Sequence, residues 1–95
     1  MFIILLKFSN NKSQAGQFMD GHNAWIQRGV DDGVFLLVGS IRPALGGAIL
    51  AHHCSKEQLQ QRINADPFII EDVVSADIIE IAANRADDRL QFLLE

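Results

Sequence analysis

The sequence predicts a small α+β domain of the ferredoxin-like type, in which two helices cover one face of an antiparallel sheet. Three observations predict this fold class. Four short apolar segments have the composition of strands, two segments with helical spacing separate them in the order β-α-β-β-α-β, and no repeat or linker interrupts the 95 residues. With 48% apolar residues the chain can build a single core, and a domain of this size is expected to gain stability from a partner.

The first half of the chain is expected to contain a strand, a helix and a second strand. The segment FIILLKF at 2–8 is apolar on both alternating faces, which is typical of a strand with both sides covered. Ser13 is the expected cap of a helix that runs from 14 to 30. Its apolar and small residues follow helical spacing, with His22 in the same stripe: Ala15, Phe18, Met19, Trp25, Ile26 and Gly29. After the turn DDGV, the segment VFLLVG at 34–39 is the second strand.

The second half is expected to contain a strand, a helix and a last strand. The segment AILAHH at 48–53 is the third strand, and Ser55 with Gln58 forms a capping box for a helix that ends at about Ala65. Pro67 stops that helix, and one further turn leads to the last strand, VVSADIIEIAA at 73–83. The domain therefore spans 1–83. Residues 84–95 are a tail, expected to form a short helix that packs on the domain or on a partner subunit through Leu90, Leu93 and Leu94.

Apolar residues occupy both faces of the strands, although two helices can cover only one face. In the first strand Phe2, Ile4 and Leu6 alternate with Ile3 and Leu5. In the second strand, Phe35 and Leu37 are expected to lie on one face, and Leu36 and Val38 on the other. In the last strand, Ile78 and Ile79 are expected to lie on opposite faces. Such a face exceeds the apolar patch that soluble monomers usually expose. We therefore expect a homodimer through the sheet face, and the tail could raise the order further.

Charge and cysteine content narrow the classes of partner. The net charge is -4 and no basic residues cluster, so neither nucleic acid nor a membrane surface is an expected partner. The apolar start reaches only to Lys7, which is too short for a membrane span, and it lacks the basic region and cleavage site of a signal peptide. Cys54 is the single cysteine, which fits a reducing compartment, so a cytoplasmic location is expected.

No metal or other cofactor is expected. The segment AHHC at 51–54 offers three ligating side chains, but successive residues of a strand point to opposite faces, so His52 and His53 cannot readily share one ion. The glycines at 46–47 lack the pattern of a phosphate-binding loop and are interpreted as a turn or bulge.

His22 is the most informative position, because its stripe points toward the sheet. A buried imidazole needs hydrogen-bond partners, since an unsatisfied buried polar group costs about 1–3 kcal/mol. Asp66, in ADPF at the end of the second helix, is the natural partner, because both helices lie on the same sheet face. A carboxylate bonded to one ring nitrogen would fix the tautomer and prepare the other nitrogen as a general base. Two alternatives remain open at this point: a core histidine bonded to a backbone carbonyl, and an aspartate that serves only a turn.

Four further residues are candidates for substrate binding. Ser40 and Arg42, in GSIRP, lie in a loop that could bind an anionic or phenolic molecule, although a loop arginine is usually only solvated. Trp25, one turn from His22, could stack on a ligand or belong to the core. Phe68 would help to exclude water from the aspartate.

Three segments together resemble the YciI-like (YCII-related) proteins: GHNAWI on the first helix, DDGVFLLVGSIRPALGGAIL across the central hairpin and INADPFI before the last strand. The resemblance covers the chain from the first strand to about Ala83. It implies a dimeric ferredoxin-like α+β barrel with a His-Asp pair, here His22 and Asp66, and a pocket wall formed by the loop after Gly39. Many members of that family have no assigned function, and some act on ring compounds, including the dehydrochlorination of chlorinated hydroxyquinol-type aromatics. The segment SIRP departs from the glycine-proline pair common after strand 2, which leaves the pocket shape and the substrate open.

Two functions are compatible with these residues. The first is a cofactor-independent enzyme that uses the His-Asp pair for general acid/base chemistry, by elimination, isomerisation or hydrolysis, on a small cyclic or phenolic molecule. The second is a non-catalytic ligand-binding or interaction domain in which the pair is a structural hydrogen bond.

Overall fold

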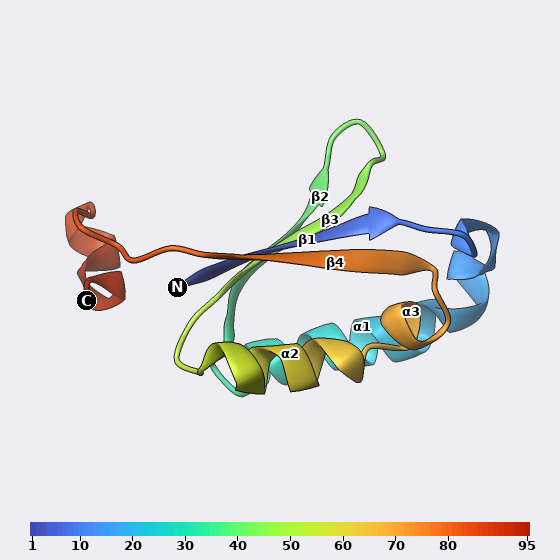
Figure 1. Cartoon of the computed structure of the whole chain (residues 1–95), viewed down its shortest axis with the longest axis horizontal. Coiled ribbons are helices and arrows are strands. Elements are labelled where there is room, and N and C mark those ends of the chain that lie inside the picture. Colours follow the sequence, from blue (N-terminus) through green and yellow to red (C-terminus); the bar gives the residue numbers. More distant parts are fainter.

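The computed structural model describes all residues from 1 to 95 and contains a four-stranded antiparallel sheet (Figure 1). Its strands are β1 (Phe2–Phe8), β2 (Phe35–Ile41), β3 (Gly46–Ala51) and β4 (Val74–Glu80). The α-helices are α1 (Ala15–Asp31), α2 (Lys56–Asn64) and the short α3 (Pro67–Ile70), and the 3-10 helices are η1 (Lys12–Gln14) and η2 (Asp88–Leu93). The strand order β2-β3-β1-β4, with antiparallel neighbours throughout, confirms the predicted ferredoxin-like α+β fold.

The strand register decides which side chains meet the helices. Ile4 of β1 lies opposite Ile49 of β3 and Ile78 of β4, and both Ile4 and Ile49 are buried. Figure 1 shows α1, α2 and α3 gathered on one side of the sheet. Because neighbouring residues of a strand point to opposite faces, Ile3 and Leu5 lie on the side away from these helices.

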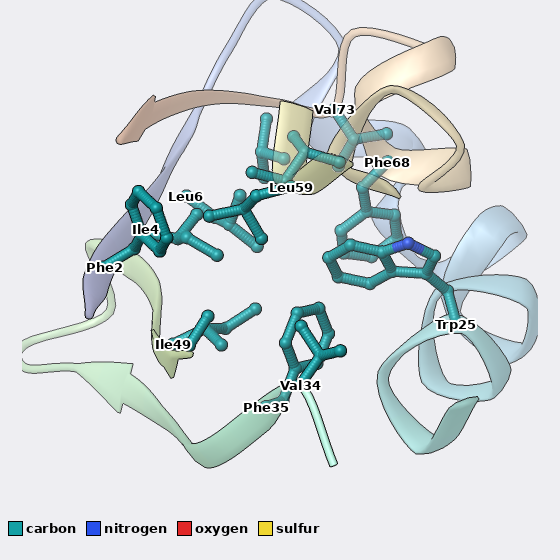
Figure 2. Packing of buried hydrophobic residues seen from close by; sticks show 13 residues of the cluster. Phe2, Ile4, Leu6, Trp25, Val34, Phe35, Ile49, Leu59, Phe68 and Val73 are labelled. Atoms are coloured by element: carbon teal, nitrogen blue, oxygen red, sulfur yellow. The ribbon is translucent and has the colours of Figure 1, made fainter. Parts of the chain in front are cut away.

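The hydrophobic core lies between the helices and the sheet face that they cover (Figure 2). Trp25 of α1 packs edge-to-face on Phe35 of β2, with ring centroids 5.1 Å apart. The indole Nε1–H of Trp25 donates a hydrogen bond to the carbonyl of Arg62 in α2 at 2.8 Å. Helix α1 can approach β2 this closely because a Cβ at Gly29 would overlap the ring of Phe35. Trp25 therefore joins α1, α2 and the sheet.

The two long helices begin in different ways. Helix α2 has the predicted capping box, since Ser55 Oγ accepts from the Gln58 N–H and Gln58 Oε1 accepts from the Ser55 N–H. The prediction that Ser13 caps the first helix is wrong, because Ser13 lies inside η1 and α1 begins at Ala15. The 3-10 turn replaces the side-chain cap: backbone carbonyls of the preceding turn accept from the N–H groups of Gln14 and Ala15.

Strand β2 departs from simple alternation. Phe35 pairs with Ala51 of β3 but Leu37 pairs with Leu50, so a bulge between them shifts the phase of the strand. The expectation that Phe35 and Leu37 share a face is therefore wrong. Phe35 is buried under the helices, whereas Leu37 points to the other face and is 57% exposed. The open face thus carries a continuous set of apolar residues from all four strands: Ile3, Leu5, Leu37, Leu50 and Ile79.

The tail forms the 3-10 helix η2 beyond the end of β4, at one end of the molecule (Figure 1). It touches the domain where the amino group of Met1 lies 3.7 Å from the Glu95 carboxylate and where the Phe92 ring packs edge-on against His52. Leu90 and Leu94 remain exposed. Their packing on a partner subunit stays a prediction. None of the helices has the length and apolar character that crossing a membrane requires.

Candidate active site

Helices α1 and α3 bring His22 and Asp66 together across 44 positions of sequence. His22 lies in the middle of α1 on the face turned toward the core, and its exposed fraction is 9%. Asp66 lies at the junction of α2 and α3 and is completely buried. Nδ1 of His22 lies 2.8 Å from Oδ1 of Asp66, and because an ionised carboxylate only accepts, the bond is assigned to an Nδ1–H donor. The pair anticipated from the sequence is therefore in contact.

Asp66 also begins a helix. Its Oδ1 accepts a second hydrogen bond from the backbone N–H of Phe68 at 3.0 Å, which makes Asp66 the N-cap of α3, with Pro67 in the first turn. Pro67 thus both ends α2 and starts α3. The other oxygen, Oδ2, is buried and has no hydrogen-bond partner. An unsatisfied buried polar atom costs about 1–3 kcal/mol, and a cost of this kind is a common feature of functional sites.

His22 lines a cavity, and its second ring nitrogen is not buried. Nε2 makes no hydrogen bond within the protein. Only one buried side-chain nitrogen or oxygen atom lacks a partner, and it is Oδ2 of Asp66. Nε2 is therefore accessible from outside the core. The imidazole also stacks on Phe68, with ring centroids 3.9 Å apart and planes within 3° of parallel. The bond to Asp66 fixes the direction of the ring and the stack fixes its plane, so Nε2 is held in position.

The cavity beside His22 has a volume of about 290 Å³ and is mainly apolar. Three polar side chains line it, those of His22, Asn23 and Ser40, while Phe8 and Phe68 contribute aromatic walls. Sites for small molecules are typically of this composition, with few polar groups in an apolar surround, and this volume is at the small end of their range. The cavity is therefore suited to a molecule of about one ring.

Of the four residues predicted to bind substrate, two line the His22 cavity and two lie outside it. Ser40 and Phe68 line the His22 cavity; Ser40 lies opposite Gly47, which in turn pairs with Leu6, so its side chain is on the helix-covered face. Trp25 is 2% exposed and lies in the core instead of the cavity wall. Arg42 follows β2 in the hairpin turn and is not part of the wall.

Other wall residues were not singled out from the sequence. Met19 and Asn23 flank His22 on α1, and Phe8 ends β1 on the same face as Leu6. Helical spacing from His22 could have indicated Met19, because residues three apart are neighbours on a helix. The contribution of Phe8 could not have been found in this way, since it depends on where β1 ends relative to α1.

Gly21 sets the distance between the two helices that carry the pair. A Cβ at Gly21 would lie 3.1 Å from Cγ of Pro67, so the missing side chain lets Pro67, and with it Asp66, approach α1. At Gly16, five residues earlier in α1, a Cβ would meet no atom within 4 Å. The two glycines therefore form a matched pair in one helix, one at the site and one away from it.

Replacing these glycines by alanine is expected to have different effects. Gly16→Ala should stabilise the protein by about 0.5–1 kcal/mol, because alanine favours a helix. Gly21→Ala should raise the free energy of unfolding by less than Gly16→Ala does, or lower it, because Pro67 must move. It should also shift the NMR signals of the His22 ring. Urea unfolding and the histidine NMR spectrum measure both effects. Equal gains in stability with an unchanged His22 spectrum would show that Gly21 does not set the spacing.

The remaining candidate groups lie away from this cavity. His52 and His53 follow β3, and the structure brings no three His, Cys, Asp or Glu side chains together as a metal site. Burial raises the pKa of the Cys54 thiol, an effect that the nearby positive charges of Arg62 and the N-terminus only partly oppose. A raised pKa leaves little thiolate at neutral pH, so Cys54 is poorly suited to act as a nucleophile.

The arrangement at His22 can transfer protons. A histidine with Nδ1 bonded to a carboxylate and Nε2 free is a general base at Nε2, and the buried carboxylate stabilises the imidazolium that forms. Ser40 shares the cavity but makes no hydrogen bond to His22, so the geometry includes no activated hydroxyl nucleophile. Proton transfer without a covalent intermediate is the chemistry that this geometry supports.

Comparison with known proteins adds information on the fold. Neither a family model nor a curated protein matches the sequence. Among solved structures, the chain is similar to 5-chloro-2-hydroxyhydroquinone dehydrochlorinase from Burkholderia phenoliruptrix AC1100, determined in complex with 2,5-dihydroxybenzoquinone. The TM-score is 0.70 over 88% of this chain and 96% of that chain, with 9% sequence identity. At this identity the likeness shows a shared fold.

Proposed function

We propose that this protein is a YciI-like enzyme in which His22, oriented by Asp66, moves a proton to or from a small cyclic or phenolic molecule. One observation carries the proposal: Asp66 occupies Nδ1 of His22 at 2.8 Å, Nε2 has no partner in the protein, and the imidazole lines a cavity of about 290 Å³. A histidine needed only for structure would gain stability by bonding both nitrogens.

The proposed reaction begins at Nε2. This nitrogen removes a proton from a ring carbon or hydroxyl of the substrate, and Asp66 stabilises the resulting imidazolium through Nδ1–H. Ser40 and Asn23 can bond ring oxygens, and the apolar walls limit access of water. Imidazolium then returns the proton to the product or to solvent. Elimination, isomerisation and hydrolysis all contain such a step, and a general base contributes about 10²–10⁴-fold to the rate.

The structural neighbour supports the choice of substrate class. Its name describes loss of chloride from a chlorinated hydroxyhydroquinone, and its bound molecule is a dihydroxybenzoquinone. Removal of a proton together with chloride is an elimination, which a lone imidazole base can assist. The test is a screen of purified protein with chlorinated and unchlorinated hydroquinones and with small lactones, monitored by ultraviolet absorbance and chloride release. Turnover above the buffer rate supports the proposal, and no turnover of any member of these classes contradicts it.

One observation favours the alternative function, a non-catalytic ligand-binding or interaction domain. Asp66 Oδ1 caps α3 as well as binding His22, so the carboxylate has a structural role whatever the histidine does. In that case substitution of His22 would lower stability but change no reaction. Ligand binding that perturbs the His22 ring without turnover of any screened compound would favour this alternative.

We also propose that the active form is a homodimer in the cytoplasm, with the open sheet faces packed together. Leu37 and Ile79 are 57% and 45% exposed on that face, and a second copy of the chain would remove them from water. The free Cys54 fits a reducing compartment. The tail could extend the assembly beyond a dimer.

The dimer leads to a test with a matched pair of variants. The wild type should be a dimer at micromolar concentration by light scattering after size exclusion, and Leu37→Asp should be monomeric, because it places a charge in the interface. Ile70→Asp is the control, since Ile70 is 63% exposed on α3, away from the open face. It should remain dimeric. A monomeric wild type would refute the interface.

A further inference from the structure

We propose that Gly47 is a specificity-determining residue of the His22 cavity, because it leaves open the space in which a small apolar substituent of the ring substrate lies. This inference rests on the proposed function. It adds to that function a feature of the substrate, a substituent of about the size of a methyl group, and the residue that limits its size.

Gly47 lies on the sheet side of the cavity. In the antiparallel register it is the partner of Leu6 in β1 and of Ser40 in β2. Residues that pair across neighbouring strands point to the same face of the sheet, and both Leu6 and Ser40 line the His22 cavity. Gly47 lines the cavity as well. A side chain at position 47 would therefore project into the cavity.

The helix-covered face of β3 shows what this glycine leaves out. Alternate residues of a strand share a face, so positions 47, 49 and 51 of β3 all point toward the helices. Ile49 is 1% exposed and fills the core at its position. At position 47 no side chain fills the corresponding space, and the cavity of about 290 Å³ lies against the strand there.

The backbone requires glycine at position 46 but not at position 47. Gly46 has a φ of +132°, and a Cβ there would overlap the carbonyl of Leu6. Gly47 has no such φ, and a Cβ on it would meet only the carbonyl oxygen of Gly39, at 3.4 Å. Glycine weakens the interior of a strand. The open space in the cavity, and not the fold, therefore accounts for Gly47.

The surroundings of Gly47 favour an apolar substituent. No Lys, Arg, Asp or Glu side chain lines the cavity, so a charged substituent would lose its hydration there without compensation. Leu6, beside Gly47, offers only methyl groups. Because Asn23 and Ser40 can bond the ring oxygens, the space at Gly47 is left for a small apolar group.

The experiment compares hydroquinone with methylhydroquinone, which differ by one methyl group, by NMR titration of the His22 ring in oxygen-free buffer. The wild type should bind methylhydroquinone about fivefold to tenfold more tightly, because the methyl group fills apolar space. Gly47→Ala places a methyl group of the protein in that space, so it should abolish this preference and change the affinity for hydroquinone little. Its urea midpoint should equal or exceed that of the wild type, because the added Cβ fits without overlap.

Gly16→Ala is the control and should retain the preference, since Gly16 does not line the cavity and a Cβ there meets no atom within 4 Å. Three results would overturn the role of Gly47 while hydroquinone binding still supports the His22 site: equal affinities in the wild type, a preference that survives Gly47→Ala, or a lower urea midpoint of that variant. Failure of both ligands to perturb the His22 ring of the wild type would contradict the proposed function, and the present inference with it.

Discussion

Substituting asparagine for His22 is expected to lower turnover by about 10²–10⁴-fold, the usual contribution of a general base. Asparagine is the informative choice because its amide N–H can still donate to Asp66 Oδ1, which keeps that carboxylate partnered. What it removes is Nε2, the ring nitrogen that no protein group binds. The measurement is the initial rate with the best substrate from the ring-compound screen.

The control for this substitution lies on the same helix. Asn23→Ala changes a cavity-lining side chain next to His22 but leaves the imidazole in place, so it should raise KM more than it lowers kcat. Circular dichroism and unfolding curves verify that both variants are folded. If His22→Asn retained the wild-type kcat, His22 would not be the base.

Asp66→Ala is expected to destabilise the protein by about 2–4 kcal/mol, because it removes the cap of α3 and leaves the buried Nδ1–H of His22 and N–H of Phe68 without acceptors. The completely buried position of Asp66 leaves no room for solvent to replace these bonds. The urea midpoint measures this loss, and it should be accompanied by weaker helical signal if α3 unfolds.

Asp66→Asn is the matched variant for this residue. It keeps the shape and one carbonyl acceptor but removes the charge, so it should cost less stability than alanine while still lowering turnover. If alanine were as stable as the wild type, Asp66 would not be the link between α1 and α3. If asparagine were fully active, the charge of Asp66 would not be needed for the reaction.

Much of the fold could be predicted because local sequence signals agreed with the tertiary structure. The stripe through His22 and Trp25 gave the buried face of α1, and Ser55 with Gln58 gave the start of α2. The predictions that were wrong concern positions where the local backbone structure differs from the simple pattern that the residues suggest. The 3-10 turn η1 replaced the expected cap at Ser13, and a bulge in β2 moved Leu37 to the open face. Neither could be read from the residues themselves.

The candidate site was predictable in part for the same reason. A histidine inside an apolar stripe requires a partner, and the fold order placed Asp66 within reach. Burial and topology alone left other partners open, and the resemblance to the YciI-like proteins favoured this pair. The cavity wall did not follow, because it depends on three-dimensional positions: Phe8 joins it through the end of β1, and Trp25 is withdrawn from it by a bond to the backbone of α2. The role of Gly21 as a spacer between α1 and α3 could not be predicted, because it depends on Pro67 lying next to Gly21 in the folded chain.

The most direct test of the central claim is the nitrogen NMR spectrum of the His22 ring, recorded with and without a hydroquinone ligand. The three histidines can be assigned by substituting each in turn. In its neutral form His22 should carry its proton on Nδ1, and its Nε2 signal should shift when ligand is added while those of His52 and His53 do not. A proton on Nε2, or an Nε2 signal that no ligand of this class moves, would contradict the account.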